Sequence, residues 1–130
     1  MPSAANRARG AAVRASGSCL CGGVRYEVRG PLRDVIACHC SQCRKTSGHF
    51  VAASQALSAD LVLIASATLE WYRSSAAAER GFCSRCGGNL FWRPSGRVPA
   101  VTSIMAGTLD PPTGLRIVEH LFVEDKSDYY

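Results

Sequence analysis

Long apolar runs are missing from this sequence of 130 residues, and so is any basic stripe interleaved with aromatic residues. No stretch approaches the roughly 18 consecutive apolar residues of a membrane helix, so we expect no membrane association. Without the basic and aromatic stripe, we expect no nucleic acid partner. Amphipathic helices longer than about two turns are missing as well, which favours a mainly β structure.

The N-terminal residues differ in composition from the rest of the chain. Residues 1–16 contain three arginines and no acidic residue. This bias is typical of an organelle transit peptide, but the apolar stretch of a secretory signal is missing, and a disordered tail is the simpler interpretation. We therefore predict a disordered tail over residues 1–16 and a single domain over residues 17–130, a length sufficient for its own hydrophobic core.

The seven cysteines are an odd number and fall into C-x-C, C-x-C-x-x-C and C-x-x-C patterns. Paired disulfides would leave one cysteine over, and clustering of this kind is typical of metal ligation in a reducing compartment, so we expect a cytoplasmic protein. The formal charge of +5 counts neutral thiols. Seven thiolates remove seven charges and two zinc ions add four, so the metallated chain would carry +2.

Two of the cysteine patterns are separated by about 60 residues but resemble each other. Cys19 and Cys21 are followed by two glycines, and so are Cys83 and Cys86. Glycine permits the left-handed backbone of a tight turn whose N–H groups face the sulfurs. We interpret the two turns as half-sites of one closed, four-thiolate structural zinc site. The alternatives are buried free thiols or a redox C-x-x-C, but no helix is indicated after Cys86, as a thioredoxin-like site requires.

The remaining cysteines, Cys38, Cys40 and Cys43, lie within six positions and provide three ligands for a second zinc ion. Its fourth position is either open to a ligand from solution or closed by His49 or His120, and the spacing leaves both possibilities standing. His39 lies between two ligands and is expected to point away from the metal.

A basic pair, Arg44 and Lys45, directly follows Cys43. These two residues would offset the negative charge of three thiolates and of an external thiolate, and we predict them as substrate-binding residues. The alternative is an ordinary solvated face.

Alternation of apolar and charged side chains over residues 23–29 predicts a half-buried strand. A short helical turn, capped by Ser41 and ended by Gly48, is expected after Cys40. Five aromatic residues are expected in the core rather than in contact with a ligand. They are Tyr26, Trp71, Phe82, Phe91 and Trp92. Further strands are expected over residues 35–38, 49–54, 68–73, 80–83, 89–93, 98–105 and 115–123, while residues 55–67 are ambiguous between helix and strand.

Four segments together resemble one known family. They are GSCLCGGVRYEV at 17–28, CHCSQCRKTSG at 38–48, FCSRCGGNLFW at 82–92 and EHLFVEDK at 119–126. The sequence resembles the glutathione-dependent formaldehyde-activating enzymes, a zinc-binding family that also includes centromere protein V. The resemblance runs from about Gly17 to the C-terminus and includes all seven cysteines.

This resemblance implies a single zinc-binding domain of the mainly β fold called the β-tent, with two zinc ions per chain. Four cysteines would hold the structural zinc: Cys19, Cys21, Cys83 and Cys86. Three would hold the catalytic zinc: Cys38, Cys40 and Cys43. The implied activity joins glutathione to formaldehyde as S-(hydroxymethyl)glutathione, which is carbon–sulfur lyase chemistry in reverse. The alternative function is a non-catalytic, zinc-stabilised binding module of the same fold.

Overall fold

The computed structural model describes residues 12–130, which form ten strands, one α-helix and three 3₁₀ turns. The strands are β1 (Ala15–Ser18), β2 (Arg25–Val28), β3 (Val35–Cys38), β4 (Val51–Leu57), β5 (Leu61–Ala65), β6 (Leu69–Ser75), β7 (Ala78–Cys83), β8 (Asn89–Pro94), β9 (Val101–Met105) and β10 (Ile117–Leu121). The helix is α2 (Ser41–Ser47), and the 3₁₀ turns are Ser58–Asp60, Ala106–Thr108 and Val123–Asp125. The prediction of a mainly β, single small domain is confirmed.

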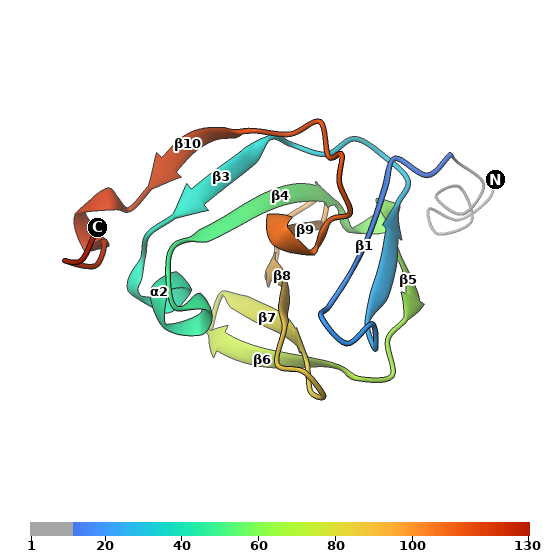
Figure 1. The fold of residues 1–130 in the computed structure, drawn as a ribbon, viewed down its shortest axis with the longest axis horizontal. Coiled ribbons are helices and arrows are strands. Elements are labelled where there is room, and N and C mark those ends of the chain that lie inside the picture. The colour runs from blue at the N-terminus through green and yellow to red at the C-terminus, as the bar shows by residue number, and fades with distance from the viewer. Residues whose placement is uncertain (1–11) are drawn as a thin grey trace.

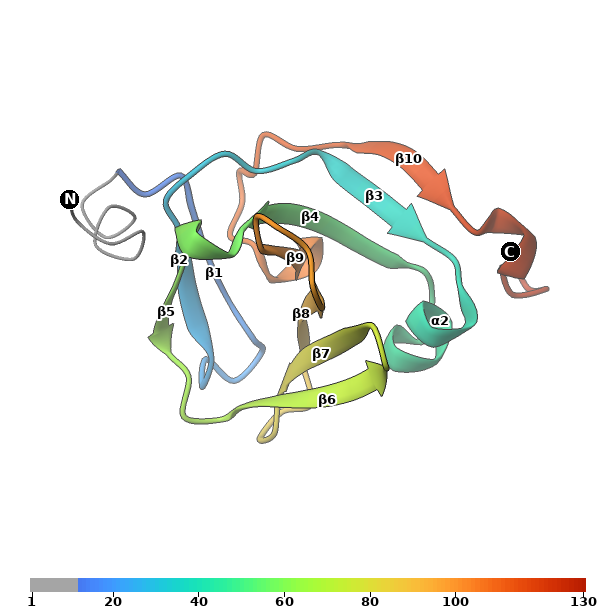
Figure 2. The ribbon, with the colours of Figure 1, turned by 180° about the vertical axis from the view of Figure 1, so that it is seen from behind.

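The strands form two sheets. The smaller has the order β1-β2-β5 and the larger the order β10-β3-β4-β9-β8-β7-β6. Neighbouring strands are antiparallel except β10, which pairs with β3 in parallel. Figures 1 and 2 show the larger sheet curling so that β3 and β4 lie across from β6 and β7. Helix α2 lies at one end of the molecule and the smaller sheet at the other.

The main core lies where the smaller sheet packs against the larger one. Tyr26 and Phe91 are fully buried and meet edge to face, with ring centroids 5.3 Å apart. The alternation predicted for residues 23–29 is confirmed, because Tyr26 and Val28 are buried while Arg25 is exposed. A second, smaller cluster of buried side chains lies next to α2 and contains Cys43, Val51, Ala53 and Met105.

The N-terminal boundary of the domain lies before the predicted residue 17, and Arg14 N already donates to the backbone oxygen of Val28 at 2.7 Å. Ala15 and Ser16 belong to β1 and pair with Val28 and Glu27 of β2. They form a strand because β2 offers a free edge whose backbone groups require partners. Residues 12–14 precede β1. The rest of the predicted disordered tail, residues 1–11, lies outside the described residues.

Strand β10 brings the C-terminal part of the chain to the second cysteine cluster. Its parallel register on β3 places Leu121 opposite Cys38 and His120 opposite Ala37. Residues about 80 positions apart therefore become neighbours there. No helix within residues 12–130 combines the length and the apolar character needed to cross a membrane.

Candidate metal centres and the adjoining pocket

The four cysteines of the two C-x-C and C-x-x-C turns converge between the sheets. Their ligand atoms all lie within 4.8 Å of one another. Cys21 Sγ is 3.7 Å from both Cys19 Sγ and Cys83 Sγ. A tetrahedral zinc ion with Zn–S bonds of about 2.3 Å requires S···S edges of about 3.8 Å, whereas a disulfide requires about 2.05 Å. The sulfurs therefore have the spacing of metal ligands, and this donor set fits a zinc ion.

Each half-site is a tight turn whose backbone N–H groups point at sulfur. In the first turn Val24 N donates to Cys19 Sγ at 3.3 Å and Gly23 N donates to Cys21 Sγ at 3.4 Å. Gly22, at φ 77°, provides the left-handed residue, and Gly87, at φ 75°, does the same in the second turn. The predicted similarity of the two turns is thus present in their backbone.

The electrostatics of the second turn favour a thiolate. Thr68 Oγ1 lies 3.3 Å from Cys83 Sγ, and Cys86 N donates to the same sulfur at 3.5 Å. The contact with Thr68, followed by the N–H of Cys86, lowers the pKa of the Cys83 thiol to about 6. Hydrogen bonds to the charged form stabilise it, and a thiolate is the form that binds metal.

The second cluster is formed by Cys38, Cys40 and Cys43, whose sulfurs also lie within 4.8 Å of one another. Cys38 ends β3 and Cys43 lies in the first turn of α2. The expected cap, Ser41, is instead the first helical residue, and Cys40 is the N-cap, whose sulfur accepts from Cys43 N at 3.4 Å. The expected helix end at Gly48 is confirmed at φ 85°. One short segment therefore orients all three sulfurs.

The three histidines do not join this cluster. His39 Nε2 lies 3.0 Å from His120 Nδ1, and His39 Nδ1 lies 2.6 Å from the hydroxyl of Tyr130. His49 Nδ1 lies 2.6 Å from the hydroxyl of Tyr129. Within residues 12–130, the group that could hold a metal here consists of the three cysteines alone. The geometry thus agrees with an open fourth position.

Without a cation two of the three thiols resist ionisation, whereas at Cys40 the effect of burial is outweighed by hydrogen bonds from the N–H of Cys43 and its neighbours, which lower the pKa. Burial, followed by contacts with the Cys38 and Cys40 thiols, raises the pKa of the Cys43 thiol to about 12. Burial likewise raises the pKa of Cys38. Three adjacent thiolates therefore need a positive charge among them, and a divalent metal ion provides it. This donor set also fits zinc, with one position left for a further ligand.

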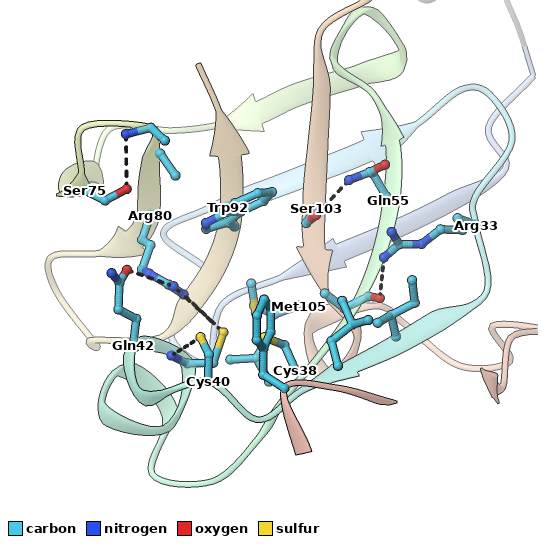
Figure 3. A pocket seen from close by; sticks show the side chains of 18 of the residues that line it. Arg33, Cys38, Cys40, Gln42, Gln55, Ser75, Arg80, Trp92, Ser103 and Met105 are labelled. Atoms are coloured by element: carbon cyan, nitrogen blue, oxygen red, sulfur yellow. Dashed lines mark hydrogen bonds between the residues drawn. The ribbon is translucent and has the colours of Figure 1, made fainter. Parts of the chain in front are cut away.

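A pocket of about 430 Å³ opens beside the three cysteines. It lies inside the curl of the larger sheet, and Figure 3 shows Cys38 and Cys40 at one side of it with Trp92 and Met105 nearby. Tyr26 and Phe91 are core residues as predicted, but Trp92 is only partly buried and lines this pocket. An apolar pocket of this size next to a few polar groups is typical of a small-molecule site.

Arg80 of β7 is the cation closest to the sulfurs. Its Nη1 and Nη2 lie 3.9 and 3.8 Å from Cys43 Sγ, and Nη2 donates to Gln42 Oε1 at 3.5 Å. The residue is 5% exposed, and its buried Nε has no hydrogen-bond partner. A guanidinium is always charged, and burying one is costly without a nearby negative charge. Among the described residues Arg80 forms no ion pair with a carboxylate, and the group beside it that can become negatively charged is the Cys43 thiol.

The predicted substrate-binding residues Arg44 and Lys45 are not among the residues that line the pocket. Arg44 Nε donates to the backbone oxygen of Asp125 at 3.1 Å, and Lys45 is exposed. Three other arginines line the pocket: Arg33, Arg80 and Arg97. The sequence analysis missed these three arginines because they come from separate segments. The one available signal was Arg80, which lies within a strand that leads to Cys83.

Residues 14–125 match the family model described as glutathione-dependent formaldehyde-activating enzyme. The chain belongs to this family. A relative from Halomonas elongata, provisionally named a glutathione-dependent formaldehyde-activating enzyme, is 35% identical over 127 residues, covering 87% of this chain and 77% of the relative. A crystal structure of a Rhodobacter sphaeroides protein is similar with a TM-score of 0.65 and 27% identity, covering 81% of this chain and 98% of that one. The recognition of the formaldehyde-activating family from sequence is confirmed.

Proposed function

We propose that the protein catalyses the reversible joining of a small thiol such as glutathione to formaldehyde, as a zinc-dependent carbon–sulfur lyase acting in a reducing compartment such as the cytoplasm. One zinc would be structural, held by four cysteines of a β-tent-like domain, and the other catalytic, held by Cys38, Cys40 and Cys43. The observation that carries this proposal is a three-cysteine cluster that faces a pocket, with no further ligand residue joining it among residues 12–130.

The reaction needs no oxidant or reductant. The thiol sulfur forms a bond to the formaldehyde carbon, the carbonyl π bond breaks, and the thiol proton ends on the new hydroxyl oxygen. A bound zinc ion supplies a positive charge that lowers the pKa of the thiol and polarises a carbonyl oxygen.

The protein's own residues would control charge and water around this reaction. Three thiolates and a bound zinc ion would carry a net charge of −1, and a fourth thiolate would make it −2. Arg80, 3.8 Å from Cys43 Sγ, offsets this charge inside the pocket. Trp92 and Met105 provide apolar walls that hold the alkyl part of the thiol and displace water.

The test is to replace zinc by cobalt and add glutathione. A fourth sulfur on the metal should strengthen the thiolate-to-cobalt absorption, while S-methylglutathione, which forms no thiolate, should leave it unchanged. Arg80→Met should weaken thiol binding about tenfold, Arg80→Lys should recover part of it, and Arg73→Met, an exposed change on the neighbouring strand β6, should have no effect.

Turnover is measured separately, because formaldehyde also adds to thiols without a catalyst. Exchange between ¹³C-formaldehyde and S-(hydroxymethyl)glutathione, followed by NMR, should be faster with the two-zinc protein than with Cys43→Ser. If thiol binds but exchange is not accelerated, the protein is a zinc-stabilised binding module. If millimolar glutathione leaves the cobalt spectrum unchanged, the open site does not take thiols at all.

A further inference from the structure

The charge of the pocket lining is entirely of one sign. Arg33, Arg80 and Arg97 line the pocket, and no aspartate or glutamate is among the lining residues that the structure describes. One of these arginines, Arg80, is accounted for by the cysteine sulfurs beside it. The other two have no such partner in the site, so their charge calls for a separate explanation.

Two of the three arginines, Arg80 and Arg33, lie at different places in the pocket (Figure 3). Figure 3 shows Arg80 beside Gln42 and the sulfurs, whereas Arg33 lies on the opposite side, next to Gln55, with Met105 in between. Gln55 Nε2 donates to Ser103 Oγ at 3.1 Å, so polar groups gather at that side too. The pocket thus has two polar sides separated by an apolar middle.

Arg33 is held rigidly at this second side. Its Nη2 donates to the backbone oxygen of Ala53 at 3.0 Å, and its Nε donates to the backbone oxygen of Asp34 at 3.2 Å. Arg97 is exposed, in the segment between β8 and β9. Within residues 12–130, neither Arg33 nor Arg97 forms an ion pair with a carboxylate.

Arg33 and Arg97 both line this pocket, so an anion that enters it meets two positive charges. Burial lowers the pKa of Arg33, the charge of Glu119 raises it, and the charge of Arg97, the smallest of the three effects, lowers it. Glu119 is an exposed residue of β10 and does not line the pocket. A carboxylate entering the pocket would gain charge-assisted hydrogen bonds from a guanidinium that is already oriented.

We infer that the pocket selects a thiol with a carboxylate at its other end: the carboxylate binds Arg33 and Arg97 while the sulfur faces Cys38, Cys40 and Cys43. This inference rests on the proposed function and names its substrate class. It assigns no partner to an ammonium group, because the lining contains no acidic residue. If glutathione is the substrate, its amino group remains in solvent and one of its carboxylates binds the two arginines.

The test uses matched thiols on the cobalt-substituted protein. A series of ω-mercaptocarboxylates of increasing chain length is compared with the corresponding primary amides and aminoalkanethiols, and dissociation constants are read from the thiolate-to-cobalt absorption. At the best chain length the acid should bind about tenfold more tightly than its amide. The aminoalkanethiol should bind most weakly of the three, and added salt should reduce the difference.

Variants assign the effect to the two arginines. Arg33→Gln and Arg97→Gln should each remove much of the preference for the acid while leaving the dissociation constant of the amide unchanged. Arg33→Lys should keep part of the preference, and Arg97 is exposed, so its substitution does not threaten the fold. Arg25→Gln, which removes the same charge from the smaller sheet, should change nothing.

Two results would overturn the inference, and they differ in what else they overturn. If amides bind as tightly as acids, or if both glutamine variants keep the preference, carboxylate selection is wrong while thiol binding at the open site stands. If no thiol of any charge alters the cobalt spectrum, the proposed function fails together with the inference.

Discussion

The two cysteine clusters use the same ligand chemistry but connect different parts of the chain. The four-cysteine cluster joins a turn after β1 to a turn after β7, across 62 residues between Cys21 and Cys83. The three-cysteine cluster is contained in residues 38–43. Because metal binding that joins distant segments is also folding free energy, the first cluster should determine whether the domain folds. The second can gain or lose its metal with less consequence.

The two cysteine clusters also differ in the residues that surround them. Cys19 and Cys83 belong to the main core together with Tyr26 and Phe91. The three-cysteine cluster instead borders a pocket and faces a buried arginine. Strand β7 contributes to both, since Arg80 faces one cluster and Cys83 belongs to the other. From this comparison we expect the four-cysteine cluster to stabilise the fold and the three-cysteine cluster to carry the proposed chemistry.

The largest expected effect comes from breaking the closed cluster. Cys83→Ser should leave the domain largely unfolded at room temperature, because a structural zinc is worth about 10 kcal/mol or more, comparable to the whole stability of a small domain. Cys43→Ser should remove one zinc ion but leave a folded protein. Zinc content and thermal melting measured on both variants check this, and equal losses would mean that both clusters are structural.

A smaller loss of stability is expected from a substitution that crowds the backbone next to the four-cysteine cluster. Gly17 lies two residues before Cys19, and a Cβ at this position would collide with the Tyr26 hydroxyl and the backbone oxygen of Thr108. Gly17→Ala should therefore destabilise the fold by about 2–3 kcal/mol in urea unfolding. Gly107→Ala is the matched control, because nothing lies within 4 Å of its Cβ position. Equal stability of the two variants would show that this end is less tightly packed than described.

The smallest expected effect is a pH dependence of the free energy of unfolding that comes from Tyr26. Burial raises the pKa of Tyr26 to about 12, against about 10 for an unfolded tyrosine. Above pH 10 the unfolded chain releases this proton while the folded protein retains it, so the contribution of Tyr26 is complete below about pH 10 and is lost as pH rises toward 12. Urea unfolding at pH 8, 10 and 11.5 should show a steeper decline for the wild type than for Tyr26→Phe. Parallel declines would assign the alkaline loss to other groups.

Local patterns were sufficient to predict much of the fold and both cysteine clusters. The alternation around Tyr26 predicted β2, and Gly48 predicted the end of α2, because these signals act over a few residues. The Ala-rich residues 55–67 were ambiguous from sequence, and they complete β4 and form β5 because neighbouring strands pair with them. Pairing with neighbouring strands therefore determined the secondary structure of this segment, which the intrinsic preferences of its residues did not.

The pocket could not be predicted in the same way. The basic pair after Cys43 suggested substrate contacts, yet the arginines that line the pocket come from the segment before β3, from β7 and from the turn after β8. Their approach depends on the curl of the larger sheet, which no local pattern encodes. The position of the histidines likewise depends on tertiary pairing, since the parallel pairing of β10 with β3 brings His120 to His39.

The order of the cysteines along the chain has a consequence for synthesis. Cys19 and Cys21 are synthesised first and the three-cysteine cluster follows. Cys83 appears 40 residues after Cys43. At about 5–20 residues per second, the 62 residues from Cys21 to Cys83 take about 3–12 seconds, during which the first pair waits beside three competing thiols. The N–H groups of Gly23 and Val24, which donate to the two sulfurs of this pair, are local. The first turn can thus form early and hold its two sulfurs apart from their rivals until β7 arrives.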